Sequence, residues 1–148
     1  MSTNNQPLNT GSQATTNYDL SKIFIWNNRY ATGLYTNSVY NPETLNPGQI
    51  MGRVGATNQL VKCFASANDG SQFPVGILAD SYVVQEGVTQ SVTICVMGDV
   101  VADKVIFEEN DGFNTVVNGS GNRTLLDLLQ AQGVKITQNT EMTDYDNQ

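Results

Sequence analysis

The sequence predicts a mainly β protein of short strands, with one main helix near the C-terminus and a disordered N-terminal arm. Three observations support this prediction. Runs rich in Val, Ile and aromatic residues recur between residues 22 and 136, and Gly, Asn or Pro separates many of them. A single stretch, residues 123–132, has leucines at helical spacing. The first 19 residues contain almost no large apolar side chains.

Residues 1–19 are predicted to be a flexible arm. They are mostly Asn, Gln, Ser and Thr, and Leu8 is the single large aliphatic residue after Met1. Such a segment cannot bury enough apolar surface to offset the entropy lost on ordering. We therefore expect this arm to be mobile in the free protein.

Residues 20–44 form a predicted strand-forming segment rich in aromatic residues. Two short strand-like runs flank Asn27-Asn28 and Gly33, which are residues that tolerate turn conformations. Six aromatic side chains lie between Tyr18 and Tyr40. Two interpretations stay open, because these rings can either cover the core or contact a ligand directly.

Residues 45–137 are predicted to form one globular domain of short strands. Asn68-Asp69-Gly70 is the strongest turn signal, so Asp69 and Gly70 are assigned to a structural turn. Gly98 is expected to break a strand. The predicted strands cover residues 49–56, 60–65, 74–79, 91–97, 99–107 and 113–117, with a final short strand around Val134 and Ile136.

The predicted helix spans residues 123–132, with Asn122 as its N-cap and Gly133 as its C-terminal stop. Its apolar stripe is expected to pack on the sheet, with Leu125, Leu128 and Leu129 in the core and Leu126 beside them. The last segment, residues 138–148, is an acidic tail without the glycine that a calcium-binding loop requires.

Composition argues against several function classes. The chain has 7 Lys and Arg against 14 Asp and Glu, a formal net charge of -7 and no His. This balance disfavours nucleic acid and anionic membranes as partners. The missing imidazole removes catalytic triads of the Ser-His-Asp kind, and two Cys cannot form a four-thiolate zinc site. We therefore expect no cofactor and no metal.

No catalytic motif is present in the sequence. A glycine-rich phosphate loop and a GxSxG nucleophile motif are both absent. Glu108, Glu109 and Asp111 are interpreted as a charged turn rather than as a glycosidase pair. No apolar run approaches the roughly 20 residues of a membrane span, and no secretory signal opens the chain. Cys63 and Cys95 are therefore expected to be free, buried thiols of a protein made in the cytosol.

Residues 45–136 resemble the head decoration proteins of tailed bacteriophages, the family of the phage lambda protein D. The resemblance rests on an ordered series of segments. These are LNPGQIMGRV, LVKCFASANDGSQFPVGIL, TQSVTICVMGDVVADKVIF and TLLDLLQAQGVKI. Residues 22–40 are also similar to the amino-terminal region of longer family members.

This resemblance implies a β-clip fold and a capsid decoration, or cement, protein that is not an enzyme. It implies a homotrimer that binds the major capsid protein at three-fold and quasi-three-fold sites, on the outside of the virion, and stabilises the head. The host bacterial cytoplasm would be the place of synthesis. The residues suggested to contact the capsid are Tyr18, Ile23, Phe24, Ile25, Trp26, Tyr30 and Tyr35.

Two alternatives remain open at the level of sequence. One is a carbohydrate-binding or adhesive module on the virion that uses Trp26, Tyr30 and Tyr35 as a sugar platform. The other is an enzyme of the dUTP pyrophosphatase type, because those enzymes are also β-clip trimers. The sequence contains no matching nucleotide-binding hairpin, and its few basic residues are scattered singly.

Overall fold

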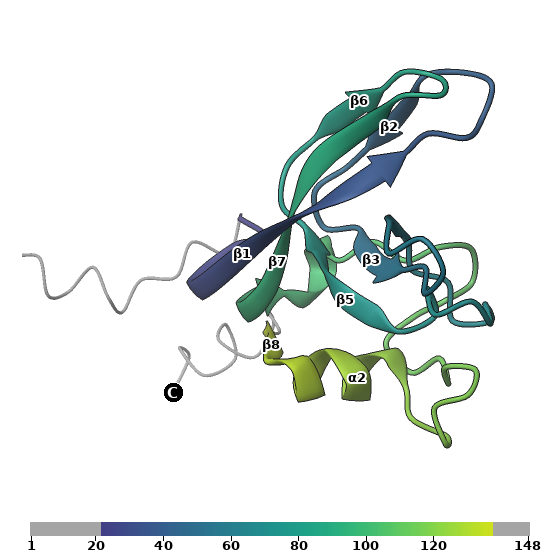
Figure 1. Cartoon of the computed structure of the whole chain (residues 1–148). Helices are drawn as coiled ribbons and strands as arrows, with labels where there is room; N and C mark the ends of the chain where they lie inside the picture. Colours follow the sequence, from purple (N-terminus) through teal and green to yellow (C-terminus); the bar gives the residue numbers. More distant parts are fainter. Residues whose placement is uncertain (1–21, 138–148) are drawn as a thin grey trace, which may run out of the picture.

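The computed structural model describes residues 22–137, and these residues form a mainly β fold with one α-helix (Figure 1). The fold class predicted from the sequence is confirmed. The elements, in chain order, are the strands β1 (Phe24–Thr36), β2 (Glu43–Leu45), β3 (Ile50–Arg53), β4 (Leu60–Lys62), β5 (Pro74–Leu78), β6 (Tyr82–Val84) and β7 (Thr89–Val101), a short 3₁₀ turn (Ala102–Lys104), the helix α2 (Leu125–Gln132) and the strand β8 (Val134–Thr137).

The two longest strands, β1 and β7, pair antiparallel along the centre of the molecule. The main sheet has the order β1-β4-β3-β5-β7-β8, and β1 also pairs with β7, so the first five strands close on themselves. Beyond this closed body β1 and β7 continue as a projection, which the small β2–β6 sheet accompanies (Figure 1). We call this projection, residues 32–45 and 82–93, the finger.

Two apolar clusters hold these parts together. The first lies in the body, where α2 and β8 pack on the sheet through buried residues that include Leu125, Leu129 and Val134. The second connects the body to the finger, since it joins Met51 and Leu60 of the body to finger residues that include Tyr35, Leu45 and Val84. The finger is therefore packed against the body and is not a loose hairpin.

The helix begins two residues later than the sequence predicts. It starts at Leu125, and Thr124 caps it, with the Thr124 hydroxyl accepting from the Asp127 amide and the Asp127 carboxylate accepting from the Thr124 amide. The predicted N-cap, Asn122, instead has a positive φ of 72°. Gly133 ends the helix as predicted, in the left-handed conformation. Leu125 and Leu129 are buried, whereas Leu128 is half-buried at the edge of the first cluster.

The prediction that Gly98 breaks a strand is wrong, and so is the prediction of two separate runs around Asn27-Asn28 and Gly33. Both β7 and β1 are continuous through these positions. Gly98 has a φ of 117°, and a Cβ atom there would lie 2.6 Å from the Asn28 Cα. The register of β1 against β7 shifts on both sides of Asn27-Asn28, which marks a β-bulge. Glycine is thus required because two backbones approach closely at the bulge.

Residues 113–117 are not a strand, contrary to the prediction, and Val116 makes only an isolated bridge to Thr124. The carbonyl groups of Phe113 and Thr115 instead accept hydrogen bonds from the first amides of α2, those of Leu126 and Leu125. The first amide groups of a helix have no acceptor within the helix, and this segment supplies acceptors for two of them. Its carbonyl groups are therefore used by α2 and not by a neighbouring β-strand.

Residues 68–70 form a bend between β4 and β5. The Asp69 carboxylate accepts hydrogen bonds from the Ser71 amide at 3.0 Å and from the Ser71 hydroxyl at 2.5 Å. These bonds lower the pKa of the Asp69 carboxyl. Gly70 has a φ of 103°, and the carbonyl oxygen of Arg53 leaves little room for a side chain at that position. Asp69 and Gly70 therefore serve as the structural turn that the sequence indicates.

Candidate interaction surface

The residues predicted to contact a partner divide into three groups along β1. Ile23, Phe24 and Ile25 are half-buried, and the first two pack on the body cluster. Trp26 and Tyr30 expose about half of their surface, 49% and 51%. Tyr35 is only 5% exposed and belongs to the second cluster. Tyr18 lies outside the described residues. The predicted set therefore does not form one exposed stripe.

Tyr35 has a structural role. Its hydroxyl donates a hydrogen bond of 2.5 Å to the Glu43 carboxylate, which also forms a 3.0 Å ion pair with Lys62. Burial, together with this hydrogen bond, raises the pKa of Tyr35 well above its usual range. The network connects β1, β2 and β4, so Tyr35 holds the finger to the body. We leave it out of the proposed contact surface.

Trp26 and Tyr30 flank the β-bulge at the N-terminal end of β1. The Asn28 side chain fixes this bulge, because its amide donates to the Asp99 carbonyl at 3.0 Å. The Tyr30 ring packs edge-to-face on Phe24, with 6.0 Å between the ring centroids. Burial, and then the nearby Cys95 and Asp80, raise the pKa of the Tyr30 phenol. The bulge and the ring contact give this end of the strand a defined shape.

The two edges of β1 differ in how much strand pairing they have. Along one side β1 pairs with β7 from Phe24 to Thr36. Along the other side, within residues 22–137, its strand pairing is confined to Tyr35 opposite Leu60. Edges of this kind accept an additional strand from another chain. Arg29 is the single charged residue of β1, and it is exposed.

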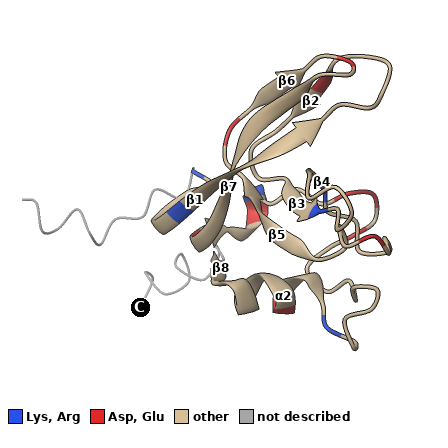
Figure 2. Ribbon diagram, in the orientation of Figure 1, with Lys and Arg blue, Asp and Glu red and all other residues tan. Residues whose placement is uncertain are grey.

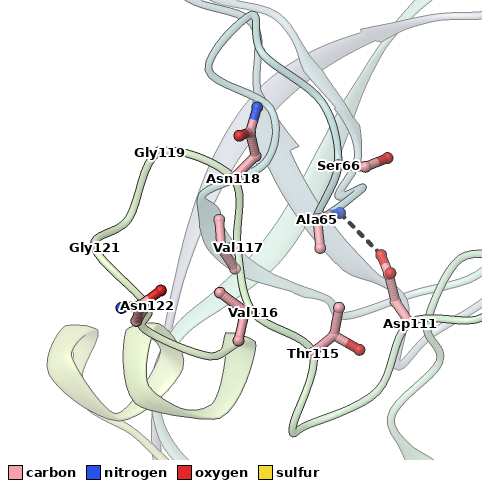
Figure 3. A pocket seen from close by; sticks show the side chains of 10 residues that line it. All are labelled: Ala65, Ser66, Asp111, Thr115, Val116, Val117, Asn118, Gly119, Gly121 and Asn122. Atoms are coloured by element: carbon pink, nitrogen blue, oxygen red, sulfur yellow. Dashed lines mark hydrogen bonds between the residues drawn. The ribbon is translucent and has the colours of Figure 1, made fainter.

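A hollow lies between Ala65-Ser66 and the loop that precedes α2 (Figure 3). It has a volume of about 570 Å³. Asp111 is its one charged side chain, and its carboxylate accepts a 2.9 Å hydrogen bond from the Ala65 amide. The remaining lining consists of small, hydroxyl, amide and valine side chains, Ser66, Thr115, Val116, Val117, Asn118 and Asn122 among them. The pocket offers hydrogen-bonding groups around a carboxylate that already has a structural partner.

Both cysteines are buried and free, as the sequence predicts. Burial, with a smaller effect of Asp111, raises the pKa of the Cys63 thiol to about 12. Burial also raises the pKa of Cys95, although hydrogen bonds to its sulfur oppose the rise. Thiols of this kind are rarely ionised at neutral pH and are therefore poor nucleophiles.

Among residues 22–137, no group of three His, Cys, Asp or Glu side chains is placed to hold a metal ion. The one α-helix of the described chain is too short to cross a membrane.

The sequence of this chain matches a known protein family. The family model of the bacteriophage lambda head decoration protein D matches residues 27–111, more than half of the chain. The chain belongs to this family. No curated protein matches it. The match begins at the bulge of β1 and runs through the finger, β3, β4, β5 and β7 to Asp111, so this head decoration protein has its family signature in the β body and the finger. The family is structural and not enzymatic.

A second group of exposed apolar residues was not singled out in the sequence. Val39, Tyr40, Val83 and Val88 are exposed, and all four lie in the finger. Val39, Tyr40 and Val88 stand in NSVYN and EGV, which look like ordinary turn sequence, and Val83 stands in the short run YVV. The available signal was one aromatic residue and three valines in segments with few charges. The tertiary pairing of β2 with β6, and of β1 with β7 at Thr36 and Thr89, brings these segments together.

Proposed function

We propose that this chain decorates the outer surface of a phage head, where it binds the major capsid protein as a homotrimer at three-fold and quasi-three-fold sites and stabilises the shell. The observation that carries the proposal is the family match, which begins at Asn27 within β1 and extends through the finger and β7 to Asp111. The acidic charge of -7 fits the outside of the shell, since packaged DNA would repel such a protein inside. Synthesis in the host cytoplasm belongs to the same proposal.

The N-terminal end of β1 is the proposed point of attachment. A capsid segment in extended conformation gains backbone hydrogen bonds along the edge of β1 that faces away from β7, and Trp26 and Tyr30 supply apolar contact area beside that edge. Because β1 is already paired with β7, the strand acts as an acceptor for an added segment. Three such contacts per trimer multiply a weak attachment into a strong one.

Binding to undecorated capsids tests this proposal. We expect imaging of purified protein mixed with empty expanded heads to show density at the three-fold sites, and the heads to resist heat longer. Deletion of residues 1–22 should leave a folded protein that binds far more weakly, because the arm contributes contacts that form only on the capsid. Equal binding and equal protection by the truncated chain would place attachment in the body alone.

A paired substitution tests the role of β1. Trp26→Ala with Tyr30→Ala is expected to weaken capsid binding about 30-fold or more, the effect typical of losing an interface anchor. Val116→Ala is the matched control, because Val116 is also about half exposed but lies beside the pocket of Figure 3. If both variants bind like the parent chain, β1 is not the contact.

The carbohydrate alternative is weakened by the position of Tyr35. A platform of three rings needs Trp26, Tyr30 and Tyr35 on one accessible face, and Tyr35 is buried against Glu43. The remaining two rings are tested by a glycan array with the isolated protein. Binding there that disappears in the Trp26→Ala, Tyr30→Ala variant would favour an adhesive role over a purely structural one.

A further inference from the structure

At the body end of the molecule, β1, β7 and β8 lie side by side and turn one face away from the core (Figure 1). Val100 of β7 is buried, and its partners on β1 and β8 both pack against the body cluster. The preceding residue, Asp99, therefore points to the opposite face, because side chains alternate along a strand. Asp99 pairs with Trp26 on one side and with Lys135 on the other, so these residues form one row across that face.

This outer face presents apolar and basic side chains together. Trp26 is 49% exposed, and Met97, two residues before Asp99 on β7, is 40% exposed. Arg29 pairs with Met97, and both Arg29 and Lys135 are exposed. Arg29 is the blue stretch of β1 in Figure 2. The half-buried Asp99 offsets one of the two positive charges, so the face stays positive in a chain whose net charge is -7.

Within residues 22–137, the two basic side chains of the outer face have no acidic partner. The ion pair recorded in that range joins Lys62 to Glu43, on other strands. Arg29 and Lys135 are therefore available to the carboxylates of another segment. Complementary charge favours an acidic segment, and the exposed Trp26 and Met97 favour one that also carries large apolar side chains.

The acidic tail, residues 138–148, has this complementary composition. It lies outside the described residues, and its sequence contains no Lys or Arg and three acidic residues, Glu141, Asp144 and Asp146. Met142 and Tyr145 stand between these acids. Acidic and large apolar side chains thus alternate in the tail, as basic and apolar side chains do on the outer face.

The tail also begins beside the outer face. β8 ends at Thr137, two residues past Lys135. Neighbouring strands lie about 4.8 Å apart, so Trp26, two strands away, is about 10 Å from β8 across the sheet. Four extended residues span about 13 Å, so Glu141 can already reach the row of Lys135 and Trp26. The tail therefore reaches the outer face without any change in the described fold.

We propose that the acidic tail folds back over the outer face and covers Trp26 in the free protein. The carboxylates of the tail pair with Arg29 and Lys135, and its apolar side chains pack on the Trp26 ring. Because Trp26 also belongs to the proposed capsid contact, the tail competes with the capsid for this face. The competition rests on the proposed function, whereas the tail contact itself does not.

Trp26 is the single tryptophan of the chain, so its fluorescence reports directly on this contact. Quenching by acrylamide is measured at low salt for the full chain and for a chain that lacks residues 138–148. We expect the deletion to increase quenching and to shift the emission to longer wavelength, because water reaches the ring. Added salt should move the full chain toward the deleted one, since screening weakens exposed ion pairs. Equal quenching of the two chains at low salt would overturn the tail contact.

A charge-neutral tail of the same length tests the part played by its carboxylates. The full chain with Glu141→Gln, Asp144→Asn and Asp146→Asn is expected to be quenched like the deleted chain. A synthetic peptide of residues 138–148 should protect Trp26 of the deleted chain at about millimolar concentration, the effective concentration that a short tether provides. A peptide with the three neutral substitutions should not. Equal protection by the neutral tail would overturn pairing with the basic side chains.

A double-mutant cycle locates the contact on the sheet. In a chain with Arg29→Gln and Lys135→Gln, deletion of the tail should no longer change the quenching of Trp26. Arg53→Gln with Arg123→Gln is the matched control, because it removes the same charge from β3 and from the loop before α2. In that control the deletion should keep its full effect. Circular dichroism establishes that each variant is folded. An equal loss of the effect in both backgrounds would show a response to net charge alone and overturn the contact.

Capsid binding tests the competition separately. The tail-deleted chain is expected to bind empty expanded heads about five-fold tighter or more, the usual size of the coupling between two binding events on one protein. Unchanged binding, with the fluorescence change present, would overturn the competition alone. A full chain and a deleted chain that both fail to bind heads would overturn the proposed function and the competition, but not the tail contact, which fluorescence detects without a capsid.

Discussion

The two ends of the β1–β7 pair are stabilised in different ways. At the body end, α2 and β8 cover the sheet, and Leu125, Leu129 and Val134 are buried between them. At the finger end no helix is present, and the small β2–β6 sheet, the Tyr35–Glu43–Lys62 network and the Asn37 side chain hold the strands. The body thus depends on apolar burial, whereas the finger adds buried polar bonds to the apolar contacts of the second cluster. Substitutions at the two ends should therefore differ in size and in the region they loosen.

The largest effect is expected at the body end. Leu129→Ala should reduce the free energy of unfolding by about 2 to 5 kcal/mol, because the side chain is fully buried and leaves a cavity. Urea unfolding monitored by circular dichroism measures this loss. Leu128→Ala is the matched control on the same helix, and its half-buried position predicts a smaller loss, about 1 kcal/mol. Equal losses would mean that the helix does not present one buried face.

A smaller, more local effect is expected at the end of the finger, where the buried Asn37 joins residues 37–42 to residues 85–88. Asn37→Ala leaves the carbonyls of Asn41 and Val84 and the amide of Val39 without their side-chain partner. Each lost bond to a buried group costs about 1 kcal/mol or more, so we expect a total of about 2 to 4 kcal/mol. Hydrogen exchange should show faster exchange in residues 37–42 and 85–88 first. Uniform acceleration across α2 and β8 would contradict a separately stabilised finger.

The link between the two ends should depend on pH. Burial raises the pKa of Glu43, but hydrogen bonds from Tyr35 and Lys62 and the charge of Lys62 outweigh it, and the net pKa is below the usual 4.5. Glu43 therefore stabilises the folded chain fully above that value, and the contribution is lost as the pH falls through the lowered pKa. Glu43→Gln should cost about 1 kcal/mol at pH 7 and much less at acidic pH.

Thermal unfolding of the parent chain and of the Glu43→Gln variant between pH 7 and pH 3 measures how the stability difference between them shrinks as the pH falls. Asp127→Asn is an informative companion, because the Asp127 carboxyl also has a lowered pKa, but at the exposed start of the helix. A stability difference for Glu43→Gln that stays constant with pH would show that the charge of Glu43 does not link the finger to the body.

The smallest effect on attachment is expected from the cysteines. Cys63 and Cys95 are both buried, Cys63 in the body cluster and Cys95 in β7 opposite Tyr30, so neither thiol is itself exposed to a partner. Replacing both with Ala should leave capsid binding unchanged and lower only stability, by the loss of buried side-chain volume. Mass spectrometry of native particles provides the second measurement. A Cys63–Cys95 bridge found there would contradict the prediction of free thiols.

Local sequence signals were sufficient for the features that depend on neighbouring residues. The leucine spacing located α2, Gly133 located its end, and Asp69-Gly70 located a turn, because these features need only the backbone preferences and side chains of a few consecutive residues. The short apolar runs likewise predicted β3, β4, β5 and β8. The ordered segments also indicated the family, which the match over residues 27–111 confirms.

Tertiary structure decided the features that depend on distant parts of the chain. Gly98 stays within β7 because Asn28, 70 residues earlier, faces it across a bulge. Residues 113–117 serve the start of α2 instead of forming a ladder. Among aromatic residues of one strand, pairing buries Tyr35 beside Glu43 and leaves Trp26 and Tyr30 half exposed. Local composition cannot distinguish these cases, because burial depends on which distant strand covers each face.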